Sequence, residues 1–286
     1  MLKLRQAILA TLVYADIFHY PLTEDEIWRY LIGAKSTLAN FRKNLNLLIK
    51  QKKLTNTSGF YTLFNQKKFI LMRIKRKPIA VTKLKIAQTY ARWLGKIPTV
   101  RLIGISGALA MENVPKEDDI DFFIITAPHC IWITRLVITV ISDVFNIRRR
   151  PGDSQFADKL CLNMFIDGKY LEFPDSEKDV YTAHEIVQLK IIINKHQTYE
   201  RFLLANRWLE KFLPQAVVFS KDVEQLKSVW NIFVIPIELL VKQLQLIYMK
   251  RKRTTETIRP AMLKFHPQDV RSRVMKEFEK RIKVLR

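Results

Sequence analysis

Length, composition and charge limit the classes to which this chain can belong. Its 286 residues are enough for two domains, and 48% hydrophobic residues with 17 Phe exclude a disordered chain. Only seven Gly argue against a loop-rich β protein, and the 49 Lys and Arg against 27 Asp and Glu leave a net charge of +22. The composition favours a helix-rich α/β or α+β fold.

The first 65 residues show the pattern of three helices followed by a hairpin. Apolar positions at helical spacing predict a helix over residues 3–16, and Thr23 with Glu26 forms a capping box that begins a second helix. A third helix is expected after the cap Ser36, and two short β-prone runs over residues 54–64 predict a hairpin.

In this order of elements, residues 1–65 resemble a winged helix-turn-helix domain. Arg42, Lys43 and Lys50 are among the basic residues of the third helix. The resemblance implies that this helix and the hairpin contact nucleic acid. The alternative is a winged helix that binds another protein.

Residues 66–97 are strongly basic and helical in pattern. The residue before a proline avoids the helical region, so the sequence Lys75–Pro78 predicts a break and a domain boundary near it. We therefore expect a basic helical linker over residues 66–97.

The remaining chain is expected to form a core over residues 98–175 and a helical C-terminal region over residues 176–286. Apolar runs predict strands over residues 100–105, 119–126, 159–166 and 169–173, with a helix over 130–146 between the second and third. The last two strands are expected to join at a turn at Asp167–Gly168.

The segment LIGISGALAMENVPKEDDIDFFIIT carries the pattern of a catalytic motif. A predicted strand ends at Ser106–Gly107 and a helix follows at once. The unpaired N–H groups at the beginning of that helix can bind an anion, and the glycine lets the anion approach the backbone closely. Asp119 and Asp121 alternate at the start of the next strand, face the same way and can share a metal ion, whereas Asp118 faces the other side.

This segment resembles the signature of the polymerase-beta-like nucleotidyltransferase superfamily. On that pattern Gly107 takes the glycine position, Ala108 the Ser/Gly position, and Asp119 and Asp121 the metal-ligand positions. The resemblance implies a mixed sheet flanked by helices, with Mg²⁺ on the two aspartates and a triphosphate at Ser106–Ala108. It also implies transfer of an NMP group from an NTP to an acceptor hydroxyl.

Two positions depart from the family pattern. Ala108 has no hydroxyl, although Ser106 offers one nearby. The third carboxylate, which the family carries on a later strand, is absent from residues 159–166. Two residues are candidates for its place: Asn163, on the face expected to hold Lys159, Cys161 and Phe165, or Asp158, just before the strand.

Charge is distributed unevenly along the chain. Residues 1–97 hold 19 basic and 4 acidic side chains, residues 98–175 hold 8 and 11, and residues 176–286 hold 22 and 12. An acidic centre between basic flanks suits a site that holds cations and receives a polyanion, which favours nucleic acid as a partner. The alternative is a lysine-rich composition that serves only solubility.

A second function fits the same features. The missing third carboxylate is consistent with a nucleic-acid-binding regulator whose degenerate nucleotidyltransferase core only senses nucleotides. An antitoxin-like role, which small members of the superfamily play, is disfavoured by the large appended regions.

The helix expected near residues 181–190 offers further candidates for contacts with a nucleotide, although no motif supports them. Tyr181 suits stacking on a base and Lys190 suits a phosphate contact, but Tyr181 or His184 packing inside the helix layer is the alternative. The spacing of His184 and Glu185 does not suit a metal pair. The basic segment after Pro267 is expected either to fold back as an arm or to form a solvated terminal helix.

Cysteine use and hydropathy predict a cytoplasmic location. Cys130 and Cys161 lack the spacing of a zinc site or a disulfide framework. The apolar stretches 131–147 and 229–249 are interrupted by charges or proline and are predicted to be core helices rather than membrane spans. Contact of the second stretch with a membrane surface is left open.

Overall fold

The computed structural model describes residues 2–63, 66–150, 152–220, 223, 231–250, 257–265 and 270–284. It is 52% helix and 16% strand, which confirms the prediction of a helix-rich α+β protein. Its strands form a three-stranded antiparallel sheet and a six-stranded mixed sheet. Within the residues just given, no helix combines the length and the apolar character needed to cross a membrane.

The N-terminal unit contains three helices and the small sheet β1-β3-β2. Its elements are α1 (Leu4–Ile17), β1 (Leu22–Thr23), α2 (Glu24–Arg29), α3 (Leu38–Lys50), β2 (Thr55–Thr57) and β3 (Phe60–Thr62). The predicted capping box is confirmed, since the Glu26 carboxylate accepts a hydrogen bond from Thr23 N at 2.8 Å. The third helix begins one residue later than predicted, because Thr37 rather than Ser36 caps it.

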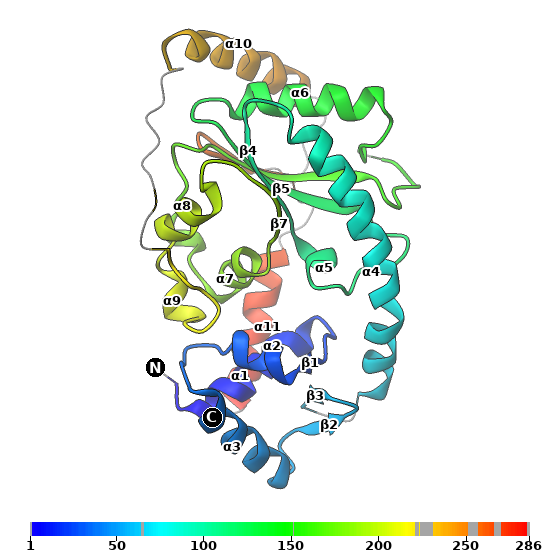
Figure 1. The fold of residues 1–286 in the computed structure, drawn as a ribbon, viewed down its shortest axis with the longest axis vertical. Helices are drawn as coiled ribbons and strands as arrows, with labels where there is room; N and C mark the ends of the chain where they lie inside the picture. Colours follow the sequence, from blue (N-terminus) through cyan, green and yellow to red (C-terminus); the bar gives the residue numbers. More distant parts are fainter. Residues whose placement is uncertain are drawn as a thin grey trace.

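One long helix, α4 (Lys67–Leu94), connects the N-terminal unit to the large sheet (Figure 1). The predicted break at Lys75–Pro78 is wrong, because α4 continues through Pro78. A proline inside a helix removes one backbone hydrogen bond. Burial of the small residues Ala80, Ala87 and Ala91 in the sheet's apolar layer offsets this cost.

The large sheet has the strand order β7-β4-β5-β6-β9-β8. Its strands are β4 (Val100–Ile105), β5 (Ile120–Thr126), β6 (Leu160–Ile166), β7 (Lys190–Asn194), β8 (Thr257–Arg259) and β9 (Met262–Lys264). The pair β5 and β6 is parallel, whereas the other described pairs are antiparallel. This mixed sheet agrees with the predicted core, and β4, β5 and β6 lie within one residue of their predicted bounds.

Two secondary-structure predictions after β6 are wrong. Residues 169–173 form no strand, because Phe173 is buried in the core and its N–H donates to Asn206 Oδ1 at 2.9 Å. Residues 176–286 are not wholly helical, because β7, β9 and β8 complete the sheet. These strands are short and lie toward the sheet edges, where periodicity is weakest. The division of the chain into domains stays a prediction.

Helices cover both faces of the large sheet. The other helices are α5 (Gly107–Ala110), α6 (Ile131–Val144), α7 (Val180–Val187), α8 (Thr198–Ala205), α9 (Leu209–Phe212), α10 (Asn231–Lys250) and α11 (Val270–Val284), with a 3₁₀ turn at Asp175–Glu177. One face packs with α4, α6 and α10, and the other with α1, α7, α8 and α11.

The terminal helix α11 folds back on the N-terminal unit, as one of the two sequence alternatives expected (Figure 1). The Phe278 ring meets the Tyr14 ring edge-on at 5.6 Å, and Arg281 Nη1 lies 2.5 Å from Asp16 Oδ2. Pro267, which was predicted to precede this helix, lies outside the described residues. The first and last helices of the chain therefore share one apolar core with the sheet.

Candidate metal and nucleotide site

Two aspartates meet at the beginning of β5. Asp119 directly precedes the strand and Asp121 is its second residue. The pairing of β5 with β6 sets Cys161 opposite Asp121. One ligand atom from each of these three residues lies within 4.8 Å of the others. The alternation expected from the sequence thus brings Asp119 and Asp121 together, and the group does not include Asp118.

The two carboxylates are electrostatically unlike each other. Asp121 is partly buried, and this burial together with the nearby Asp119 charge raises the pKa of Asp121 to about 7. The Cys161 thiol hydrogen-bonds to Asp121, and burial raises the pKa of that thiol far above its usual range. Cys161 therefore stays protonated and acts as a donor to the carboxylate.

Asp119 is 6% exposed and forms an ion pair that the sequence did not predict. Arg149 Nη1 lies 2.7 Å from Asp119 Oδ2, and the guanidinium also lies over the Phe156 ring at 4.0 Å. The Arg149 N–H donates to Leu160 O, which ties this loop to β6. The sequence signal was the basic run Arg148–Arg150, but its position in space depends on the loop between α6 and β6.

Gly107 forms the wall next to Asp121. Its φ is +65°, and a Cβ built on it would lie 3.0 Å from Asp121 Oδ2. A larger residue here would be strained and would press against the carboxylate. The predicted need for glycine is thus explained both by the left-handed turn and by the close approach of Asp121. The following helix, α5, is only four residues long.

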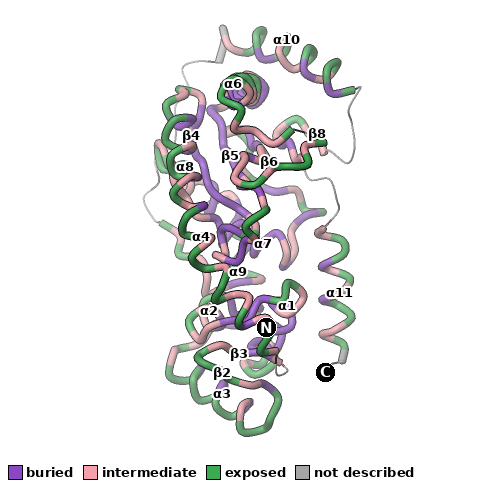
Figure 2. Tube along the Cα trace, turned by 90° about the vertical axis from the view of Figure 1, so that its right-hand side faces the viewer, coloured by how far each residue is buried: buried purple, intermediate pink, exposed green. Residues whose placement is uncertain are grey.

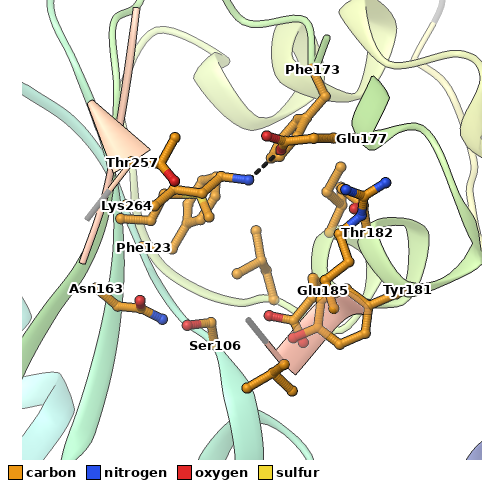
Figure 3. A pocket seen from close by; sticks show the side chains of 15 residues that line it. Ser106, Phe123, Asn163, Phe173, Glu177, Tyr181, Thr182, Glu185, Thr257 and Lys264 are labelled. Carbon is orange, nitrogen blue, oxygen red and sulfur yellow. Dashed lines mark hydrogen bonds and ion pairs between the residues drawn. The ribbon is translucent and has the colours of Figure 1, made fainter. Parts of the chain in front are cut away.

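A cavity of about 340 Å³ lies between the sheet and α7 (Figure 3). Ser106 and Asn163 come from the sheet side and face Tyr181 and Glu185 of α7. Within the described chain, neither Ser106 Oγ nor Asn163 Oδ1 finds a hydrogen-bond partner, although both residues are at least 95% buried. Unpaired buried polar atoms are costly, so this wall is built to receive a polar ligand or ordered water.

A second cavity of about 330 Å³ lies between the N-terminal unit and the sheet. Gly107, Ala108 and Asp121 form its wall on the sheet side. The remaining lining includes aromatic side chains and one arginine, namely Tyr14, Phe18, Tyr20, Tyr30 and Arg76. Tyr181 and Glu185 line both cavities, so the two spaces adjoin at α7, and Asp121 lines the second.

Glu185 is a site residue that sequence reasoning missed. It is partly buried between the cavities, and desolvation raises its pKa to about 7, against the opposing effect of Lys264. Lys264 itself is ion-paired with Glu177 on the far wall of the first cavity (Figure 3). The sequence alone does not mark Glu185 as an acid or base, because its surroundings depend on how α7 packs against β5.

The neighbouring candidates on α7 and β7 have packing or pairing roles. His184 is 2% exposed, stacks on Tyr14 with ring centroids 3.9 Å apart, and its burial lowers its pKa to about 4. This agrees with the alternative in which His184 packs. Lys190 Nζ lies 2.5 Å from Glu112 Oε1, which holds it beside the loop after α5.

The two candidates for the third carboxylate lie in other surroundings than the aspartate pair. The β5–β6 register shifts after Asp121, and this irregularity turns Asn163 into the first cavity while Phe165 joins the opposite face of the sheet. The expectation that Asn163 and Phe165 share a face is therefore wrong. Asp158 pairs with the buried Lys83 of α4 at 2.7 Å. The group at the aspartates instead includes Cys161.

Both cysteines are free, as predicted. The chain was compared with models of protein families, with curated proteins and with solved structures, and none of the three comparisons finds a match.

Proposed function

We propose that this protein is a nucleotidyltransferase that moves an NMP group from an NTP to an acceptor hydroxyl. The observation that carries the proposal is the pair Asp119 and Asp121 at the beginning of β5, where Asp121 lies against the Gly107 turn and lines the second cavity. The two cavities offer separate places for a nucleotide and for an acceptor. The spacing of glycine and aspartates matches the family pattern noted in the sequence.

The donor atoms suit Mg²⁺ better than a soft metal ion. Two carboxylates supply hard oxygens, and Mg²⁺ commonly takes one or two protein carboxylates and completes its shell with water and phosphate oxygens. The protonated Cys161 thiol is a poor ligand for Mg²⁺ and is already a hydrogen-bond donor to Asp121. A cation would also relieve the repulsion that raises the pKa of Asp121.

When bound by Asp119 and Asp121, Mg²⁺ would supply charge neutralisation for the triphosphate and its leaving group. Gly107 lies against Asp121, and its backbone together with the buried Ser106 hydroxyl would bind phosphate oxygens. Arg149 would exchange its pairing with Asp119 for a phosphate, so that its charge stays in the site.

The acceptor hydroxyl needs a group that removes its proton. Glu185 faces both cavities and has a pKa of about 7, which is close to the optimum for a general base at neutral pH. We therefore assign the base to Glu185. Replacement by Glu185→Gln should abolish transfer and spare nucleotide binding. Asn163→Asp and Asp158→Ala test the two earlier candidates in the same assay.

The test of the proposed activity uses the full chain with each labelled NTP, Mg²⁺ and total cell RNA. The expected result is that wild type transfers label to one RNA fraction and Asp119→Asn does not. The control is Asp118→Asn, which removes a neighbouring carboxylate outside the pair. Label in none of the fractions, or equal labelling by Asp119→Asn, would contradict the proposal of transfer to nucleic acid.

The second candidate is a nucleic-acid-binding regulator that only senses nucleotides. It is supported by Cys161 beside the pair and by the helix, strand, helix, helix and hairpin order of α1 to β3, which is that of a winged helix-turn-helix. Arg42, Lys43 and Lys50 are exposed on its third helix. Mg²⁺-dependent NTP binding that alters nucleic-acid affinity, without any transfer, would favour this candidate.

A further inference from the structure

The helix α10 exposes most of its large apolar side chains and buries two polar ones. Between Val234 and Lys250 its exposed large apolar residues are Ile235, Ile237, Leu239, Leu240, Leu244, Ile247 and Tyr248. Glu238 and Gln245, by contrast, are 8% and 7% exposed. A surface helix in water normally has the opposite arrangement. Exposed large apolar patches mark places where a protein meets another apolar surface.

The inward polar residues fix α10 in this orientation. The Glu238 carboxylate accepts hydrogen bonds from Trp132 N at 2.7 Å and Ile133 N at 2.9 Å, and so caps the first turn of α6. Gln245 Nε2 donates to Trp132 O at 2.8 Å, and Arg135 donates to Gln245 Oε1. Because these contacts use the polar face, rotation of α10 to bury its leucines would leave Glu238 and Gln245 without their present partners.

The supporting helix α6 also exposes apolar side chains. Its residues Leu136, Val140 and Val144 recur at four-residue spacing and are exposed, and Phe145 follows them at 61% exposure. Figures 1 and 2 both place α6 and α10 at one end of the molecule, opposite to the N-terminal unit. We call the exposed apolar residues of these two helices the apolar end.

The residues around the apolar end are basic and aromatic. Trp93 of α4 is 52% exposed and its ring lies 6.3 Å from that of Phe145, with the exposed Arg92 and Lys96 beside it in the chain. Lys250 ends α10 and is exposed, and Tyr248 precedes it. Aromatic residues and cations around an apolar surface are the composition of proteins that lie on anionic membranes.

A second copy of the chain fits this surface less well. A symmetric contact would bring together two apolar ends with the same basic surroundings in a chain of net charge +22. Anionic lipid headgroups instead complement these cations, while the acyl region receives the leucine and isoleucine side chains.

We propose that the apolar end docks the protein onto an anionic lipid surface, with α10 lying in the plane of the interface. This binding is peripheral, in agreement with the finding that no described helix is suited to span a membrane. It is independent of the proposed nucleotidyl transfer, because the apolar end lies on the helices of the opposite sheet face from α7.

The test is co-sedimentation of the full chain with vesicles of phosphatidylcholine and phosphatidylglycerol, and with vesicles of phosphatidylcholine alone. The variant Leu240→Glu/Leu244→Glu changes two side chains that are 61% and 58% exposed, so it should fold normally. The control Leu71→Glu/Ile74→Glu makes the same charge change at two exposed positions of α4, 58% and 50% exposed, away from the apolar end.

Wild type and control should partition onto the anionic vesicles, and the α10 variant should partition at least about tenfold less. Binding should be weaker on neutral vesicles and should fall with salt. The proposal is overturned if wild type stays in the supernatant, or if the α10 variant partitions like the control. A third outcome also overturns it: the wild type binds no vesicles but self-associates, and the α10 variant no longer self-associates.

Discussion

At the scale of single residues, the sequence predicts the pair but not its surroundings. Asp119 and Asp121 are predictable because alternate residues of a strand share a face, whatever the strand's neighbours are. Arg149, Cys161 and Glu185 come from a loop, a neighbouring strand and a helix, so their approach depends on tertiary packing. Phe165, rather than Asn163, lies on the face opposite to the one expected, because an irregular register is invisible in the sequence.

On the proposed function, Arg149 would compete with a cation for Asp119, because its guanidinium lies 2.7 Å from that carboxylate. We predict that Arg149→Gln raises the affinity for Mn²⁺ or Mg²⁺ in the absence of nucleotide severalfold, and lowers the affinity for the Mg²⁺–NTP complex. Calorimetric titration measures both. The control is Arg150→Gln, whose partner is Asp143. Unchanged cation affinity in Arg149→Gln would show that the ion pair does not limit cation binding by the aspartates.

His184 should make stability depend on pH. Its burial lowers its pKa from 6.5 to about 4, so the folded state favours the neutral ring. The stabilising effect is complete above pH 6.5 and is lost as pH falls toward 4, by up to about 3 kcal/mol. His184→Phe should keep the contact with Tyr14 and remove this part of the pH dependence of urea unfolding. An unchanged pH dependence of urea unfolding in His184→Phe would contradict this assignment.

At the scale of elements, hydropathy patterns find the central strands and miss the edges. β4, β5 and β6 are buried runs bounded by turn residues, and each was predicted within one residue. β8 and β9 have three residues each, too few for a period to show, and β7 follows α7 with only two residues between them. The continuation of α4 through Pro78 depends on packing against the sheet, which local preference does not encode.

The basic third helix should provide the nucleic-acid contact. Lys43 and Lys50 of α3 are exposed, so Lys43→Glu/Lys50→Glu in the full chain should weaken RNA or DNA binding at least tenfold and reduce its salt dependence. Fluorescence anisotropy at several salt concentrations measures both. Lys276→Glu/Lys280→Glu makes the same charge change on α11 and serves as the control. Equal loss in both variants would indicate only a nonspecific effect of net charge.

At the scale of the whole molecule, three distant parts of the chain converge on one site. α1 and α4 of the first third, β5 and β6 of the middle, and α7 beyond them all contribute to the lining of the two adjoining cavities. α11 then returns from the C-terminal end to pack against α1 and α7. Among the described residues, helices of both basic flanks are thus attached to the acidic centre by shared apolar cores.

The most direct measurement is calorimetric titration of the full chain with Mg²⁺ and non-hydrolysable NTPs. The account predicts Mg²⁺-dependent binding of an NTP by wild type and Asp118→Asn, and a loss of at least about tenfold in Asp119→Asn and Asp121→Asn. Both variants should stay folded by circular dichroism, since each removes a repelling carboxylate. An absence of Mg²⁺–NTP binding by wild type, together with unfolding of both variants, would contradict the account and leave the pair a structural feature.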